Sequence, residues 1–173
     1  MSVTLIVGGA RSGKSSRAEN LAQQSQFDVV YIATSPHMQG DEEWQQRIQK
    51  HQQERPKHWR TVEENIDLCG VLNNLKGDQC ALVDCLTLWL FNIMSEERDI
   101  AVEIERLCSC LGKLEQRVLL VSNELGMGLV PEQKLGRDFR DQQGRLNQAV
   151  AKVAAHVEFM VAGIPMVLKG ENL

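Results

Sequence analysis

The sequence predicts an α/β fold, with a mostly parallel sheet flanked by helices. Short apolar runs alternate with helical patterns along the chain, which is the order expected when each strand leads into a helix. Most of these runs are continuously apolar rather than alternating, so the strands should be buried on both faces, as in a parallel sheet. The chain has 173 residues, and we expect one domain over residues 1–173.

The elements follow from these patterns in chain order. Apolar runs predict strands at 3–7, 29–34, 80–84, 118–122, 158–163 and 165–169. Helices are predicted at 14–25, about 41–54, 64–75, 86–113 with a break, and about 138–156. The segment 126–138 is rich in glycine and reads as a loop. The last two strands are joined through Gly163 and Ile164, so we expect a closing antiparallel hairpin.

Composition limits the class of protein. Hydrophobic residues make up 43% and charged residues 24%, which is ordinary for a soluble globular protein. The net charge of −4 argues against a broad nucleic-acid interface. The longest apolar run, 80–94, contains Asp84 and is too short to span a bilayer, so we expect no stable membrane insertion. The five cysteines are odd in number and lack a Cys-x-x-Cys pair, which favours free thiols in a cytoplasmic protein.

The stretch GGARSGKS, residues 8–15, has the pattern of a phosphate-binding loop. It follows a predicted strand and opens a predicted helix, so its backbone N–H groups and the helix dipole can converge on a phosphate. Lys14 would neutralise phosphate oxygens, and the Ser15 hydroxyl would bind Mg²⁺. The alternative is a glycine-rich strand–helix turn that arose by chance.

A second metal-binding group is expected at the end of a neighbouring buried strand. Asp84 follows the apolar run 80–83, which is the arrangement of a Walker-B aspartate. Alternatively, Asp84 is the N-cap of the helix that begins near Leu86. The guanine-reading Asn-Lys-x-Asp motif is missing, so the residues do not identify the nucleotide base.

A histidine lies among cations in the predicted helix 41–54. On a helix, Arg47, His51 and Arg55 fall on one stripe roughly 80° wide, with Ile48 beside it. One interpretation is a partly buried structural histidine on a basic helix. The other is a nucleophile, because neighbouring cations keep an imidazole neutral and attract a polyphosphate. Spacing alone leaves both open. His156 is placed at a helix end, where it would complement the dipole.

Six segments in order resemble the bifunctional adenosylcobinamide kinase/adenosylcobinamide-phosphate guanylyltransferase family of cobalamin biosynthesis. They are GGARSGKS (8–15), YIATS (31–35), RIQKHQQERPKHWRTVE (47–63), LVDCLTLWL (82–90), SNELGMGLVPE (122–132) and GRDFRDQQGRLNQAVA (136–151). The resemblance covers nearly the whole chain. It implies a P-loop NTPase domain similar to the RecA type and a homotrimer.

The resemblance also implies the residues of the site. His51 would carry GMP, and Lys14 would assist phosphoryl transfer. Ser15 and Asp84 would hold Mg²⁺. Nucleotide contacts would come from Gly8, Gly9, Ala10, Arg11, Ser12, Gly13, Lys14, Ser15, Thr34, Ser35, Pro36, Gln52, Gln53, Glu54, Arg55, Glu63 and Asp84.

Two reactions are implied. The first moves a γ-phosphoryl group from GTP or ATP to adenosylcobinamide. In the second, GTP gives GMP to His51, and adenosylcobinamide phosphate then takes it to form adenosylcobinamide-GDP. The alternatives are a simple P-loop small-molecule kinase in which His51 is structural, and a non-catalytic GTP-binding regulator. The segment 123–132 is suggested to shape the corrinoid or trimer surface; alternatively, Glu124 and Glu132 are solvated charges on a structural loop.

Overall fold

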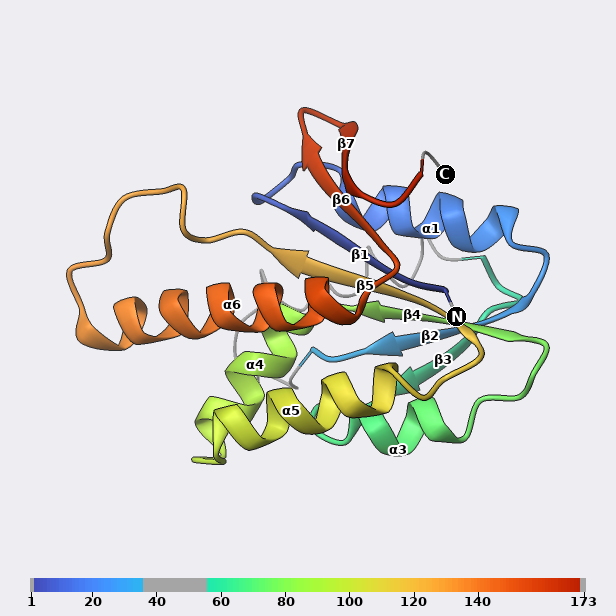
Figure 1. Ribbon diagram of the computed structural model, residues 1–173, viewed down its shortest axis with the longest axis horizontal. Helices are drawn as coiled ribbons and strands as arrows, with labels where there is room; N and C mark the ends of the chain where they lie inside the picture. The colour runs from blue at the N-terminus through green and yellow to red at the C-terminus, as the bar shows by residue number, and fades with distance from the viewer. Residues whose placement is uncertain (1, 36–55, 172–173) are drawn as a thin grey trace.

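The structure, a computed structural model, describes residues 2–35 and 56–171. Its centre is a seven-stranded sheet with the order β3-β2-β4-β5-β1-β6-β7 (Figure 1). The strands are β1 (Ser2–Gly8), β2 (Asp28–Ala33), β3 (Arg60–Glu63), β4 (Gln79–Asp84), β5 (Arg117–Asn123), β6 (His156–Val161) and β7 (Ile164–Lys169). The helices are α1 (Lys14–Gln24), α3 (Leu68–Asn73), α4 (Leu86–Ser95), α5 (Ile100–Leu111) and α6 (Lys134–Val153). The helix predicted at 41–54 lies outside the described residues.

The sheet is parallel apart from its last pair of strands. The pairs β1–β5, β1–β6, β2–β3, β2–β4 and β4–β5 are parallel, and β6–β7 is antiparallel. Ala162 and Gly163 join the last two strands with φ angles of 51° and 81°. Two successive positive φ angles are characteristic of the type I′ turn, whose twist matches a hairpin. The parallel sheet and the closing hairpin predicted from the sequence are confirmed.

Helices cover both faces of the sheet, and the strands bury side chains toward each. Figure 1 shows α1 on one face and α3, α4, α5 and α6 on the other. Along β5, Leu119 and Val121 belong to the apolar cluster under α1, whereas Val118 and Leu120 belong to the cluster under the other helices. Because side chains alternate along a strand, both faces need apolar residues, which explains the continuous runs in the sequence.

The strand β3 was not predicted. It has only four residues, and of these Val62 alone is apolar. Among the described strands it pairs with β2 alone, from Val30↔Arg60 to Ala33↔Glu63, and therefore forms one edge of the sheet. An edge strand has a neighbouring strand on one side only and is less buried than a central strand, so it needs no continuous apolar run.

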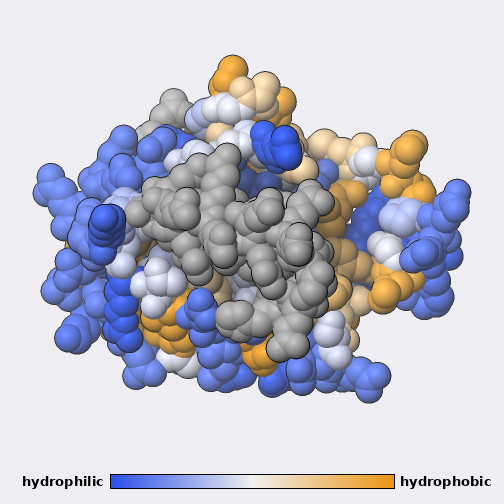
Figure 2. Space-filling view, turned by 180° about the vertical axis from the view of Figure 1, so that it is seen from behind, coloured by the Kyte–Doolittle hydropathy of each residue, from blue (hydrophilic) through white to orange (hydrophobic). Residues whose placement is uncertain are grey.

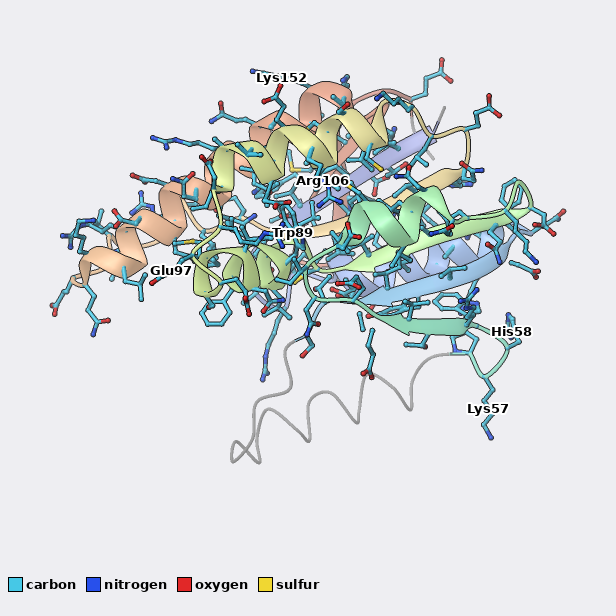
Figure 3. All side chains as sticks on the ribbon, turned by 90° about the horizontal axis from the view of Figure 1, so that it is seen from below. Lys57, His58, Trp89, Glu97, Arg106 and Lys152 are labelled. Atoms are coloured by element: carbon cyan, nitrogen blue, oxygen red, sulfur yellow. The ribbon has the colours of Figure 1, made fainter. Side chains whose placement is uncertain are left out.

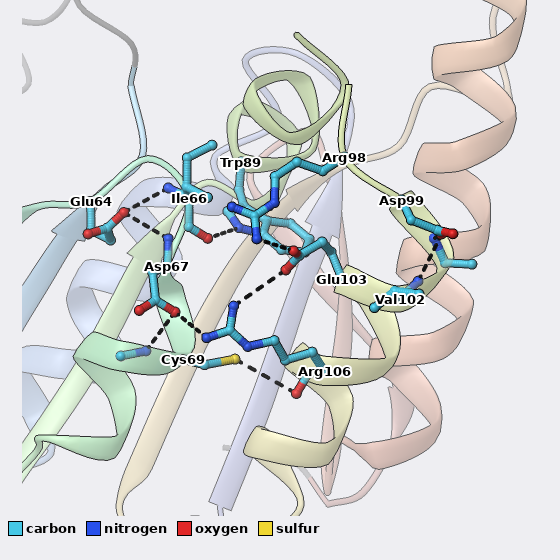
Figure 4. Close-up of polar contacts among 12 residues, drawn as sticks. Glu64, Ile66, Asp67, Cys69, Trp89, Arg98, Asp99, Val102, Glu103 and Arg106 are labelled. Carbon is cyan, nitrogen blue, oxygen red and sulfur yellow. Dashed lines mark hydrogen bonds and ion pairs between the residues drawn. The ribbon is translucent and has the colours of Figure 1, made fainter. Parts of the chain in front are cut away.

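The helix predicted from residue 64 begins four residues later. The Glu64 carboxylate accepts hydrogen bonds from the backbone N–H groups of Ile66 and Asp67, each at 2.8 Å, and so forms a turn (Figure 4). The Asp67 side chain then accepts from Gly70 N–H at 3.1 Å and caps α3. The same Asp67 carboxylate pairs with Arg106 of α5 at 2.7 Å, which joins the two helices.

The predicted bounds of the helix at 138–156 were also wrong. The helix α6 begins at Lys134, before Gly136, and ends at Val153. Ala155 N–H already bonds to the carbonyl of Val3 in β1, so the chain has entered the sheet. His156 is therefore the first residue of β6 rather than a helix end, and its side chain is buried.

Apolar side chains are exposed in two places. One group lies on the hairpin, at Val161, Ile164, Met166 and Leu168, and the other on the loop before α6 and its first turn, at Met127, Leu129, Val130 and Leu135. Figure 2 shows both groups as orange areas, at the top and at the right. A search of the described helices finds none with the length and apolar character needed to cross a bilayer.

Candidate active site

Three neighbouring strands end at one edge of the sheet. Gly8 is the last residue of β1, Asn123 of β5 and Asp84 of β4, and these strands lie in the order β4-β5-β1. Gly8 pairs with Asn123, and Asp84 pairs with Val121. The phosphate loop and the candidate Walker-B aspartate thus share the carboxyl edge, with one strand between them. Ligands of open α/β sheets commonly bind at this edge.

The phosphate loop needs glycine at two of its positions. Gly13 has φ of 95°, and a Cβ there would lie 3.2 Å from the Cα of Gly163 in the hairpin turn. A Cβ on Gly8 would lie 2.4 Å from Ser12 Oγ and 2.8 Å from the carbonyl oxygen of Met160. Gly163 N–H also donates to the carbonyl of Ser12 at 3.0 Å. The closing hairpin therefore packs against the phosphate loop and helps to hold its position.

The loop leads directly into α1. Gly13 is the N-cap, and no side chain in the described residues caps this helix end. The first N–H groups of a helix lack intrahelical partners, so they are suited to binding an anion. Ser15 lies half-buried in the first turn.

The Lys14 side chain folds back over the phosphate loop. Its side chain is largely buried, and Nζ donates a hydrogen bond to the carbonyl oxygen of Gly9 at 2.8 Å. The ammonium is thus held on the inside of the loop, where it can reach phosphate oxygens. This is the arrangement that the motif predicts for its lysine.

Asp84 is held by an aromatic side chain from β2. Tyr31 donates its hydroxyl hydrogen to Asp84 Oδ2 at 3.0 Å. The N-cap of α4 is Cys85, so Asp84 does not serve as the helix N-cap considered above. The half-buried carboxylate has its other oxygen, Oδ1, to offer to a metal ion.

The Thr34 side chain is fully buried and bonded to protein. Its hydroxyl donates to the carbonyl oxygen of Cys85 and accepts from Cys85 N–H, both at 2.8 Å. The carbonyl of Thr34 accepts from Asn92 Nδ2 at 2.9 Å. Thr34 therefore joins the segment after β2 to the segment after β4 and fixes the position of Asp84. A direct contact from Thr34 to nucleotide stays a prediction.

Two polar atoms near the carboxyl edge are buried without a hydrogen-bond partner in the described part of the chain. They are Ser12 Oγ in the phosphate loop and Ser35 Oγ after β2. Buried hydroxyls usually have a hydrogen-bond partner, so we expect a ligand or a further segment of the chain to supply one for these two. Both residues are among the nucleotide contacts that the sequence predicts.

The oxygen donors at this edge suit Mg²⁺. The Ser15 hydroxyl and the Asp84 carboxylate are hard ligands, and Mg²⁺ is usually bound by one or two protein oxygens together with substrate phosphates. The residues that the structure describes contain no cluster of three or more His, Cys, Asp or Glu that could hold a metal by itself. The donor set therefore fits a metal that enters with a nucleotide.

The predicted site residues are thus only partly brought together. The strands that lead to Gly8–Ser15 and to Asp84, β1 and β4, have β5 between them. Thr34 and Ser35 follow β2, the neighbour of β4 on its other side. Glu63 ends β3 and pairs with Ala33, so it lies at the same edge but farther from the loop. Pro36, His51, Gln52, Gln53, Glu54 and Arg55 lie outside the described residues.

In the sequence analysis, Asn123 appears only as part of the segment 123–132, suggested to shape the corrinoid or trimer surface, and the side chains that hold it have no role. Asn123 follows an apolar strand just as Asp84 does, and this was the available signal. Glu124, considered as a solvated charge, instead accepts from the N–H groups of Gly126 and Met127, at 2.5 and 3.0 Å. It stabilises the turn that follows β5.

The fold is shared with P-loop NTPases. A prototypical ATPase from the type III secretion system of pathogenic bacteria aligns with a TM-score of 0.59 at 8% identity, covering 96% of this chain and 56% of that one. The P4 protein of bacteriophage phi6, solved with ADP, gives a TM-score of 0.50 at 16% identity, covering 95% and 54%. At such identities, the similarity concerns the fold alone.

Sequence comparison is more specific. The bifunctional adenosylcobalamin biosynthesis protein CobP of Pseudomonas aeruginosa is 49% identical over 172 residues, covering 98% of both chains. The corresponding protein CobU of Escherichia coli is 39% identical, covering 95% of this chain and 98% of its own. The family model described as cobinamide kinase / cobinamide phosphate guanyltransferase matches residues 4–168. This chain therefore belongs to the cobinamide kinase / cobinamide phosphate guanyltransferase family.

Proposed function

We propose that this chain phosphorylates adenosylcobinamide and then transfers GMP from GTP to adenosylcobinamide phosphate, giving adenosylcobinamide-GDP. The observation that carries this proposal is the phosphate loop at the sheet edge in a chain that matches a bifunctional relative over 98% of both lengths. One domain over residues 1–173 would perform both reactions.

The kinase step uses the phosphate loop. The loop amides, the N-terminus of α1 and Lys14 bind the phosphates and stabilise charge on the transferring γ-phosphoryl group. Ser15 and Asp84 would hold Mg²⁺, which supplies charge neutralisation at the phosphate oxygens. The bond from the γ-phosphorus to its bridging oxygen breaks, and a bond to the cobinamide hydroxyl oxygen forms, with loss of the hydroxyl proton.

The guanylyl step uses His51. An imidazole nitrogen attacks the α-phosphorus of GTP, a P–N bond forms, and pyrophosphate leaves. A phosphate oxygen of adenosylcobinamide phosphate then attacks the same phosphorus, and the P–N bond breaks. Arg47, Lys50 and Arg55 lie close to His51 in sequence and would keep its ring neutral and attract the triphosphate.

The remaining predicted contacts would form the nucleotide site around this histidine. They are Thr34, Ser35, Pro36, Gln52, Gln53, Glu54, Arg55 and Glu63. Ser35 Oγ, which is buried without a partner among residues 2–35 and 56–171, and the position of Glu63 at the end of β3 support a site on this part of the edge.

Incubation with GTP labelled at the α-phosphorus tests the guanylyl step. We expect an acid-labile label on the wild-type protein that is absent in His51→Ala. His58→Ala is the matched control, since Figure 3 shows His58 projecting beside Lys57 from the turn before β3. Phosphorylation of cobinamide without any label on the protein would instead favour the simple kinase. Nucleotide binding with neither reaction would favour the GTP-binding regulator.

We also propose that the protein works in the cytoplasm as a homotrimer. All five cysteines are free, which suits a reducing compartment. The exposed apolar groups on the hairpin and on the loop before α6 offer surface for subunit contacts. Light scattering should give three times the chain mass of 19.5 kDa, and a mass of one chain would contradict the trimer.

A further inference from the structure

We infer that Asn123 is a further catalytic residue of the kinase step, whose side-chain amide donates hydrogen bonds to the transferring phosphoryl group. This inference depends on the proposed function. It begins with the position of β5, which lies between β1 with the phosphate loop and β4 with Asp84 (Figure 1). Asn123 is the last residue of β5 and pairs with Gly8, the first residue of the loop.

Strand alternation places three side-chain positions on the same face. Ile6, Leu82 and Val121 belong to the apolar cluster under α1. Gly8, Asp84 and Asn123 each follow one of these residues by two positions, so all three lie on the α1 face. The phosphate loop turns toward α1 on that face. Asn123 thus lies between the loop that binds phosphate and the carboxylate proposed to bind Mg²⁺.

Side chains from two helices hold the Asn123 backbone. Its N–H donates to Thr87 Oγ1 of α4 at 2.9 Å, and its carbonyl oxygen accepts from Asn147 Nδ2 of α6 at 3.0 Å. The next residue, Glu124, donates its N–H to the carbonyl oxygen of Gly8 at 3.0 Å. The end of β5 is therefore fixed on both of its sides.

A buried polar network supports this arrangement. Ser122 Oγ donates to Asn147 Oδ1 at 2.6 Å, and Gln143 Nε2 donates to Ser122 Oγ at 2.9 Å and to Asn147 Oδ1 at 3.1 Å. Ser122 and Gln143 are fully buried. Gln143 acts in this network through Nε2, since its Oε1 is buried without a partner among the described residues. The two hydrogen bonds to Asn147 Oδ1 orient its side chain, so that Nδ2 holds the carbonyl of Asn123.

The Asn123 side chain is available to bind a ligand. It is half-buried, and within the described part of the chain its carboxamide makes no hydrogen bond to protein. Its Nδ2 carries two donors that are neutral at every pH of interest. A neutral donor aimed at developing phosphoryl charge stabilises the transition state without repelling Mg²⁺.

Two substitutions test the inference. In Asn123→Ala we expect the single-turnover rate of γ-phosphoryl transfer to fall by about 100-fold, with the nucleotide dissociation constant changed by less than about threefold. In Asn123→Asp, which keeps the shape, the rate should fall similarly at neutral pH and recover partly as pH falls and the carboxyl gains a proton. A merely structural residue would not give that pH profile. Asn20→Ala on the exposed surface of α1 is the matched control.

The labelling of the protein from α-labelled GTP is measured in the same variants. It should change by less than about threefold in Asn123→Ala, because that step occurs at a different phosphorus. A kinase rate in Asn123→Ala within about threefold of wild type, or an equal loss of both reactions, overturns the inference while the proposed function stands. If wild type performs neither reaction, the proposed function itself fails.

Discussion

Arg17 of α1 and Glu158 of β6 form an ion pair with two hydrogen bonds, at 2.8 Å from Nε to Oε2 and 2.7 Å from Nη2 to Oε1. The Glu158 side chain is fully buried, and its Oε1 also lies 3.3 Å from His156 Nε2. Because Arg17 lies one turn after Lys14, this pair attaches the helix behind the phosphate loop to the sheet.

Removing one partner should destabilise the protein. In Glu158→Gln the guanidinium loses the charge of Glu158, and we expect the free energy of unfolding to fall by about 2–3 kcal/mol. This is below the range for fully buried pairs because Arg17 is partly exposed. Urea unfolding measures this change. Glu105→Gln, on the exposed side of α5, should change stability little. Equal midpoints for Glu158→Gln and wild type would show that the pair does not stabilise the fold.

The same pair makes stability depend on pH. Burial raises the pKa of Glu158, but the hydrogen bond and charge of Arg17 outweigh it, so the pKa lies below its ordinary 4.5. A carboxylate with a lowered folded-state pKa contributes stability above its unfolded pKa and loses it as pH falls through the folded value. The stability difference between wild type and Glu158→Gln should therefore shrink below about pH 4.5. A difference that stays constant down to acid unfolding would contradict this.

The glycines of the phosphate loop offer a matched pair of substitutions. Gly13→Ala places a Cβ at a φ of 95° and 3.2 Å from Gly163 Cα. A left-handed backbone costs a non-glycine residue about 1–2 kcal/mol, so thermal unfolding should shift downward by several degrees. A Cβ on Gly9 meets nothing within 4 Å, and Gly9→Ala should be close to neutral. Equal destabilisation by both substitutions would refute the geometric argument.

Asp84 should control the dependence on Mg²⁺. In Asp84→Asn the kinase rate should fall by about 100-fold, and half-maximal rate should require more Mg²⁺. Nucleotide binding without Mg²⁺ should persist, since the loop amides and Lys14 are unchanged. Asp78→Asn, exposed before β4, is the control. An unchanged Mg²⁺ requirement in Asp84→Asn would remove Asp84 from the metal site.

Much of this fold could be predicted from the sequence, because a buried parallel strand needs apolar residues on both faces. The strands predicted at 3–7 and 80–84 are confirmed, since each lies within β1 or β4. The edge strand β3 was missed because Arg60 and Glu63 face solvent and leave no apolar pattern. The first turn of α6 was missed because it lies in a segment with glycine and proline, and Gly136 discourages a helix prediction.

Some residues of the candidate site could likewise be predicted from the sequence, and others could not. The phosphate loop and Asp84 are recognisable because each is a short local pattern. The partners of Asn123 are not, since Thr87 and Asn147 lie on α4 and α6, far away in sequence. The Arg17–Glu158 pair joins residues separated by 141 positions. Such contacts arise from tertiary packing, and a single sequence contains no local sign of them.

The central claim is that one histidine carries GMP between GTP and the corrinoid. It is tested most directly by isolating wild-type protein labelled from α-labelled GTP and adding unlabelled adenosylcobinamide phosphate. The account predicts that label leaves the protein as fast as the enzyme turns over and appears wholly in adenosylcobinamide-GDP, with no labelled protein formed by His51→Ala. Label that stays on the protein while adenosylcobinamide-GDP forms from free GTP would contradict it.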